Sequence, residues 1–129
     1  MRTAAVAAAL VAAAWAVAPQ GDVERGRYLV HHVAMCVQCH TPRDPRGNLV
    51  EPRLLQGAPV PLSSPFAEAW AFRAPWLAGL PGHSEEELVK LLRTGIVPRT
   101  GRPPAPPMPP FRMAESDAKA VAAYLKSLN

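Results

Sequence analysis

Apolar positions recur every three or four residues in several segments of the chain, a spacing that predicts amphipathic helices. In residues 22–34 such a stripe runs through Val23, Gly26, Val30 and Val33. In residues 115–129 the corresponding face comprises Val121, Tyr124, Leu125 and Leu128. Because each helix has an apolar side that must be covered, we expect these two terminal helices to pack on each other.

The segment between them contains the clearest signals for the start and end of a helix. Ser84 and Glu87 have the Ser-x-x-Glu spacing of a capping box, in which each side chain bonds the backbone N–H of the other residue. Gly95 is placed to end this helix. Its expected buried stripe comprises Leu88, Leu91 and Leu92.

The N-terminal segment has the layout of an export signal. Arg2 precedes an apolar run from Ala4 to Ala18 that ends in small residues. The run is shorter than the ~20 residues that a membrane-spanning helix needs. Residues 1–18 are therefore predicted to be a signal peptide, or alternatively an N-terminal anchor at the membrane, and residues 19–129 to be the folded domain. Either interpretation predicts a periplasmic or exported protein.

Composition sets the scale of the fold. A chain of 129 residues supports one domain with a modest core, and 16 prolines predict short helices joined by long, stiff loops. The formal net charge is +4, with a pI near 9.6. No run of basic residues accompanies this charge, and together with the export signal this argues against a nucleic-acid partner.

The two cysteines of the chain lie in the stretch Cys36-Val37-Gln38-Cys39-His40. A disulfide would close a loop too small to stabilise the fold by much. A thioredoxin-like pair needs a βαβ context that the flanking sequence does not indicate, and a zinc site needs a second ligand pair that the other histidines do not supply. Cys-x-x-Cys-His is instead the attachment motif of a c-type haem. It predicts thioether bonds from Cys36 and Cys39, with His40 as the proximal iron ligand.

From about Val23 to its end, the chain resembles the class I monohaem cytochromes c. It is similar in particular to the cytochrome c subunits that serve periplasmic dehydrogenases. The resemblance implies an all-α, small cytochrome c fold, with short helices wrapped around one covalently bound haem c. It also implies that the terminal helices cross at Gly26, with Tyr124 packed at the crossing.

The resemblance further implies residues around the cofactor. The family often has a Gly-Pro-x-Leu-x-Gly segment whose proline carbonyl accepts a hydrogen bond from the proximal histidine. Matching residues 51–57 to this pattern makes Pro52 the acceptor for His40, and Leu54 a wall of the haem pocket. Trp76 stands where related chains have asparagine in an Ala-Pro-Asn-Leu stretch. We expect it at the haem, either donating to a propionate or packing over the haem edge.

The second axial ligand is expected from Met108 or Met113, because Met1 lies in the export segment and Met35 adjoins the attachment motif. Met108 is followed by proline, which matches the family's methionine-proline ligand pair. Seven of the thirteen residues 98–110 are proline, so this loop is predicted to be stiff and to lose little entropy when it places a thioether on iron. We expect Met108 to ligate the iron, and the other methionine to pack in the core.

With His40 and Met108 both on iron, the resemblance implies a respiratory electron-transfer protein and not an enzyme. Its expected partners are redox proteins: a periplasmic dehydrogenase or respiratory donor, and an acceptor such as a terminal oxidase or cytochrome complex. A positive surface would speed encounter with an acidic partner. Two alternatives remain. One is a five-coordinate haem protein that binds or reduces a small ligand, and the other is a thiol-disulfide redox protein.

Overall fold

The protein is described by a computed structural model covering residues 20–66 and 69–128. The predicted export segment, residues 1–18, lies outside these residues. The helices are α1 (Gln20–Tyr28), α2 (Val37–His40), α3 (Glu85–Thr94) and α4 (Glu115–Ser127), and the strands are β1 (Gln56–Pro59) and β2 (Arg73–Trp76). Within the described part of the chain, no helix has the length and apolar character to cross a membrane.

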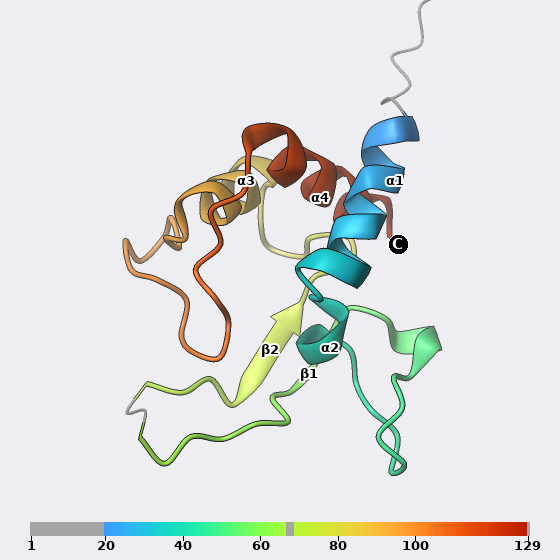
Figure 1. Cartoon of the computed structure of the whole chain (residues 1–129), viewed down its shortest axis with the longest axis vertical. Coiled ribbons are helices and arrows are strands. Elements are labelled where there is room, and N and C mark those ends of the chain that lie inside the picture. Colours follow the sequence, from blue (N-terminus) through green and yellow to red (C-terminus); the bar gives the residue numbers. More distant parts are fainter. Residues whose placement is uncertain (1–19, 67–68, 129) are drawn as a thin grey trace, which may run out of the picture.

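Helices from the two ends of the domain cross as predicted, and α4 also packs against α3 (Figure 1). A Cβ atom on Gly26 would lie 2.0 Å from the backbone oxygen of Ala120 and 2.7 Å from the Cβ of Tyr124. The close approach of α1 and α4 therefore needs glycine at this position. Outside the contact, the Arg25 guanidinium donates to the Asp117 carboxylate at 3.0 Å.

Helix α1 is followed directly by a turn of a different helix type. Leu29–Val33 forms a π-helical segment, and the N–H of Ala34 donates to the oxygen of Leu29 at 2.8 Å. A π turn contains more residues than an α turn, so a stripe predicted at α-helical spacing moves off the buried face. Val30 is fully buried, but Val33 is 56% exposed, and Leu29 is buried as well. The prediction that Val33 belongs to the buried stripe is wrong.

Helix α3 has the predicted ends. The N–H of Glu87 donates to Ser84 Oγ at 3.1 Å, and the N–H of Ser84 donates to the Glu87 carboxylate at 3.0 Å. Gly95 ends the helix in the left-handed conformation, with φ of 65°. Leu92 is buried in the core, while Leu88 and Leu91 are partly buried and turn toward a cavity described below.

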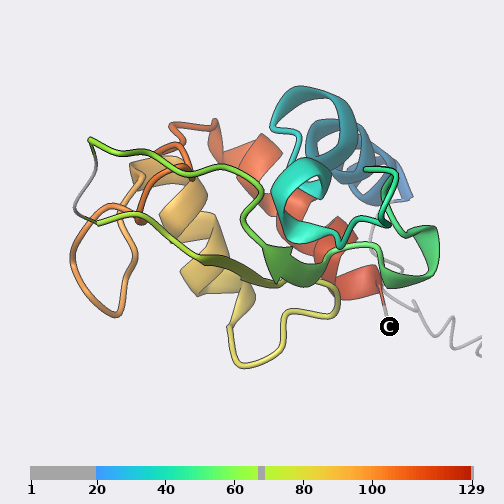
Figure 2. The same cartoon turned by 90° about the horizontal axis from the view of Figure 1, so that it is seen from below.

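The all-α prediction holds only in outline, because the mostly helical chain also contains a small sheet. β1 and β2 pair antiparallel, with Ala58 opposite Ala74. The hairpin continues past the strands, since the N–H of Val60 donates to Phe72 O at 2.9 Å. The arm that leads into β2 lies beside the proline-rich loop that follows α3 (Figure 2), where the N–H of Ala71 donates to Pro106 O at 2.7 Å.

Candidate functional site

The Cys-x-x-Cys-His stretch folds into the short helix α2. Met35 takes a positive φ of 53° between the π-helical segment and this turn. The N–H of His40 donates to Cys36 O at 3.0 Å, which closes the turn. Cys36, Cys39 and His40 thereby line one cavity together.

This cavity has a volume of about 380 Å³, which lies within the ~300–1,000 Å³ typical of small-molecule and cofactor sites. Its walls come from α2, β2, α3, α4 and the loop between α3 and α4. Most of the lining side chains are apolar, including Leu77, Leu80, Leu91 and Phe111. Such walls favour an apolar ligand and keep water away from it.

The imidazole of His40 is held by a backbone carbonyl. Its Nδ1–H donates to Pro75 O at 2.8 Å, since a carbonyl oxygen can only accept. In the neutral ring Nε2 is then the unprotonated nitrogen, which is free to ligate a metal. Only 6% of His40 is exposed, and this burial lowers its pKa, although the hydrogen bond to Pro75 acts in the opposite direction. The ring is therefore neutral at pH 7, as metal ligation requires.

The structure corrects the predicted acceptor from Pro52 to Pro75. Pro52 lies in an exposed 3₁₀ turn, and its carbonyl accepts a long, 3.5 Å bond from the side-chain amide of Gln56. Pro75 lies in β2, which packs against α2 and so brings the carbonyl under His40. A signal for Pro75 was present in the sequence. Residues 74–79, Ala-Pro-Trp-Leu-Ala-Gly, match Gly-Pro-x-Leu-x-Gly with one substitution, a better fit than the segment around Pro52.

Leu54 is also corrected, because it does not line the cavity but packs, partly buried, against the core. Leu77, the leucine of the better-matching segment, lines the cavity instead. Next to Leu54, the N–H of Leu55 donates to Thr41 Oγ1 at 3.0 Å, and Thr41 is almost fully buried. This bond fastens the loop that follows His40, and no sequence pattern indicated it.

Trp76 lines the cavity and is 50% exposed, and its place at the haem stays a prediction. Its indole Nε1–H donates to Ala78 O at 2.8 Å. Because this is the only donor of the indole, the arrangement supports packing at the cavity rim and leaves no N–H for a propionate.

The two methionine candidates lie in different environments. Met108 lines the same cavity as His40, together with the flanking residues Pro107 and Pro109. Met113 packs against the core, and its N–H donates to Leu92 O at 2.9 Å. The fold therefore brings Met108, and not Met113, to the cavity of the attachment motif.

The two cysteines do not have the properties of a redox-active thiol pair. Cys36 and Cys39 are not joined by a disulfide, and burial raises the pKa of Cys36 to about 11. Reactive thiol pairs have a lowered pKa instead, because the thiolate is the nucleophile. Within residues 20–66 and 69–128, no group of three or more His, Cys, Asp or Glu side chains is placed to hold a metal ion. At the cavity itself, the candidate metal donors are His40 and Met108, so a cofactor that carries further donors suits the site.

A haem fits these requirements. Its porphyrin supplies four nitrogen donors, its apolar faces suit the cavity walls, and its vinyl groups can react with the two thiols. His40 offers Nε2 and Met108 offers a thioether on the same cavity.

Comparison with known proteins agrees with a covalently bound haem. Residues 23–129 match the family model described as cytochrome c. The chain is also similar to a protein of Cereibacter sphaeroides named "Diheme cytochrome c-type", with 30% identity over 116 residues. The match covers 83% of this chain and 37% of that protein, so this chain spans little more than a third of its relative's length.

Proposed function

This chain belongs to the cytochrome c family, whose members bind haem covalently and transfer electrons, and from that premise we propose that it carries one haem c whose iron would be held by His40 and Met108. The relative's name describes two haems, but the two cysteines printed in this sequence make up one attachment motif. In this assignment the protein shuttles single electrons between other redox proteins.

The chain's own residues bind and orient the cofactor. Cys36 and Cys39 would form the two thioether bonds to it. The hydrogen bond from His40 to Pro75 fixes the plane of the imidazole and raises its basicity as a ligand. When bound, the haem iron supplies one-electron chemistry by changing between the ferric and ferrous states. The apolar walls limit solvent access, which tunes the reduction potential.

One observation carries the proposal: Met108 lines the same cavity as Cys36, Cys39 and a His40 whose Nδ1–H is bound to Pro75 O. If His40 and Met108 both bound the iron, no coordination position would remain for a substrate. This arrangement favours electron transfer over ligand chemistry, and it supports a carrier and not an enzyme.

Location and partners are part of the same proposal. The apolar run between Ala4 and Ala18 supports export to the periplasm, by cleavage of the segment or as an anchor. The donor would be a periplasmic dehydrogenase or respiratory complex, and the acceptor a terminal oxidase or cytochrome complex. N-terminal sequencing of the protein from washed membranes and from the soluble fraction tests this part. A mature chain that begins near Pro19 in the soluble fraction is the expected result, and an intact Met1 in membranes would indicate the anchor.

Attachment is tested by expression in a host that matures c-type cytochromes. Mass spectrometry should find a haem adduct on the wild-type peptide that contains Cys36 and Cys39. Cys36→Ala and Cys39→Ala should each leave at most one thioether bond, and His40→Ala should remove the proximal ligand. A wild-type peptide without an adduct would refute haem attachment.

A reduced wild type that binds carbon monoxide readily would favour the five-coordinate alternative.

A further inference from the structure

The loop that carries Met108 makes few hydrogen bonds through its backbone. We define residues 96–110 as the ligand loop. Proline supplies no N–H, and seven of the residues 98–110 are proline. Pro106 O accepts from Ala71, but most of the other backbone bonds of the loop are local turns such as Met108 N–H to Ala105 O. Apart from the bond at Pro106, the loop therefore depends on side-chain contacts to hold it over the cavity.

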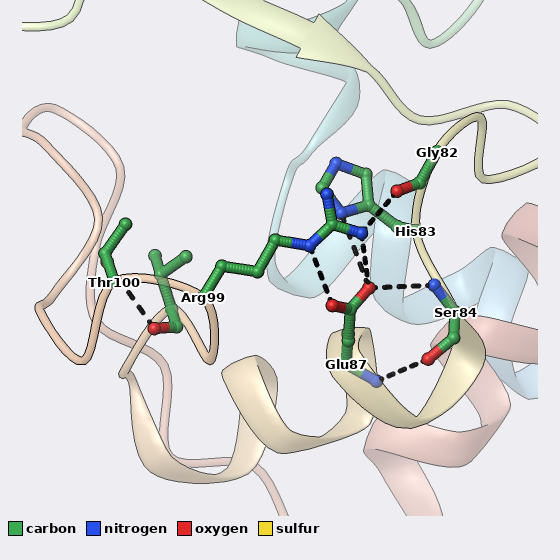
Figure 3. A network of polar contacts seen from close by, with 7 residues as sticks. Gly82, His83, Ser84, Glu87, Arg99 and Thr100 are labelled. Atoms are coloured by element: carbon green, nitrogen blue, oxygen red, sulfur yellow. Dashed lines mark hydrogen bonds and ion pairs between the residues drawn. The ribbon is translucent and has the colours of Figure 1, made fainter.

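Arg99 provides such an attachment (Figure 3). Its Nε–H donates to Glu87 Oε1 at 2.8 Å, and one Nη2–H donates to Glu87 Oε2 at 2.9 Å. The same Nη2 donates to Gly82 O at 2.5 Å. At its start the loop is also tied to the end of α3, where the N–H of Ile96 donates to Thr94 Oγ1 at 3.2 Å. Beyond that point, the side-chain hydrogen bonds that join the ligand loop to another part of the described chain come from Arg99. Two parallel N–H···O bonds make this a bidentate pair, which fixes orientation as well as distance.

Glu87 is held in place independently of Arg99. Its carboxylate accepts from the N–H of Ser84, and its own N–H donates to Ser84 Oγ, so the capping box fixes the side chain at the start of α3. A carboxylate that is already fixed loses little further entropy when an arginine binds it. The hydrogen bond from Arg99 lowers the pKa of Glu87 to about 2, with the Ser84 N–H contributing, so the carboxyl is ionised near neutral pH.

The pair also lies at the cofactor cavity. Glu87 and Arg99 line the same cavity as Met108 and His40. The next residue before the capping box, His83, lines it as well, with Nδ1 3.9 Å from Glu87 Oε2. Arg99 is nine positions before Met108 in the same loop, so a contact that fixes Arg99 on α3 limits how far the thioether can move.

We propose that the Arg99–Glu87 pair is a clasp that holds the ligand loop on α3 and thereby keeps the Met108 thioether on the iron. The proposal rests on the proposed function, because it presupposes haem with Met108 as a ligand. Neither residue of the clasp ligates the iron, so both act as positioning residues. Without the clasp, the loop should move away from the cavity more often. An external ligand could then bind the iron in place of Met108.

The test measures how tightly imidazole binds the ferric holoprotein. Glu87→Gln keeps the size of the side chain and an oxygen that can accept from Ser84, but removes the charge. Arg99→Gln removes the guanidinium from the other side. Each should raise imidazole affinity about threefold to fivefold, the upper range for a solvent-accessible ion pair. The double variant should resemble the single ones, because both remove the same interaction. Arg99→Lys keeps the positive charge but cannot form two parallel hydrogen bonds to the carboxylate. Its imidazole affinity should lie between those of the wild type and Arg99→Gln.

Two arginine variants serve as matched controls. Arg102→Gln removes a charge from the ligand loop itself, and Arg93→Gln breaks an ion pair between α3 and Glu115 of α4. Both should bind imidazole as the wild type does, and both should keep the weak far-red absorption band of methionine-ligated ferric haem.

The possible failures are distinguishable. A wild type with attached haem but without the far-red band contradicts Met108 ligation, and the clasp is refuted with it. A wild type with the band, whose Glu87→Gln and Arg99→Gln variants bind imidazole no better than the two controls, refutes the clasp and leaves the proposed function intact.

Discussion

At the scale of single residues, Met108 and Met113 lie five positions apart and have different surroundings. Met108→Ala should abolish the far-red band, let carbon monoxide bind the reduced protein, and lower the reduction potential, because a thioether favours ferrous iron. Met113→Ala should keep the band and cost about 2 kcal/mol of stability, since its side chain is only partly buried in the core. Absorption spectra and a redox titration check both variants. A band that survives Met108→Ala and disappears in Met113→Ala would move the ligand to the start of α4.

The carboxyl group of Glu87 predicts how the stability of the fold changes at acid pH. Its folded pKa of about 2 lies below the ordinary glutamate value, so the unfolded chain takes up the proton first as pH falls. The stabilisation that the ionised carboxylate provides is complete above about pH 5 and is lost progressively toward about pH 2. Urea unfolding of wild type and Glu87→Gln, measured across this range, should give midpoints whose difference is constant above about pH 5 and shrinks below it. A difference that grows on acidification would contradict this assignment.

At the scale of the elements, the crossing of α1 and α4 joins the two ends of the domain. Gly26→Ala should destabilise the holoprotein by about 1–3 kcal/mol, because the added Cβ meets the backbone of Ala120 and the helices must separate. Intrinsic helix propensity acts the other way, favouring alanine by up to ~1 kcal/mol. The sign of the measured change in stability therefore shows whether the steric contact with α4 outweighs the helix propensity of alanine. Glu24→Ala, an exposed position on the same helix, is the control and should change the urea midpoint little. A stabilised Gly26→Ala variant would refute the tight crossing.

At the scale of the whole molecule, charge should govern encounters with redox partners. The formal net charge is +4 for the full sequence and +3 once Arg2 is removed with residues 1–18, and it predicts that reduction of the ferric protein by an anionic reagent slows as salt concentration rises. With a cationic reagent the rate should rise instead, because salt screens the repulsion. Stopped-flow kinetics with one reagent of each sign checks this, and a neutral reagent is the control. The same salt dependence for all three reagents would show that the positive surface does not attract or orient charged partners.

The sequence by itself determined the features that depend on a few neighbouring residues. The spacing of Cys36, Cys39 and His40 placed the attachment motif, which folds as one helical turn. The capping box and Gly95 set the ends of α3, because their bonds span three or four positions along the chain. In these places local hydrogen bonding and backbone conformation suffice, and no distant contact is needed to predict the structure.

The tertiary structure decided which distant segments meet. The acceptor for His40 lies 35 positions away, so the choice between two proline segments depended on β2 packing against α2. The same packing put Leu77 in the cavity and left Leu54 against the core. The small sheet was missed because Gln56–Pro59 contains glycine and proline and has no strand-like alternation. Val33 turned outward because a π-helical segment changed the register, which an assumed α-helical period cannot anticipate.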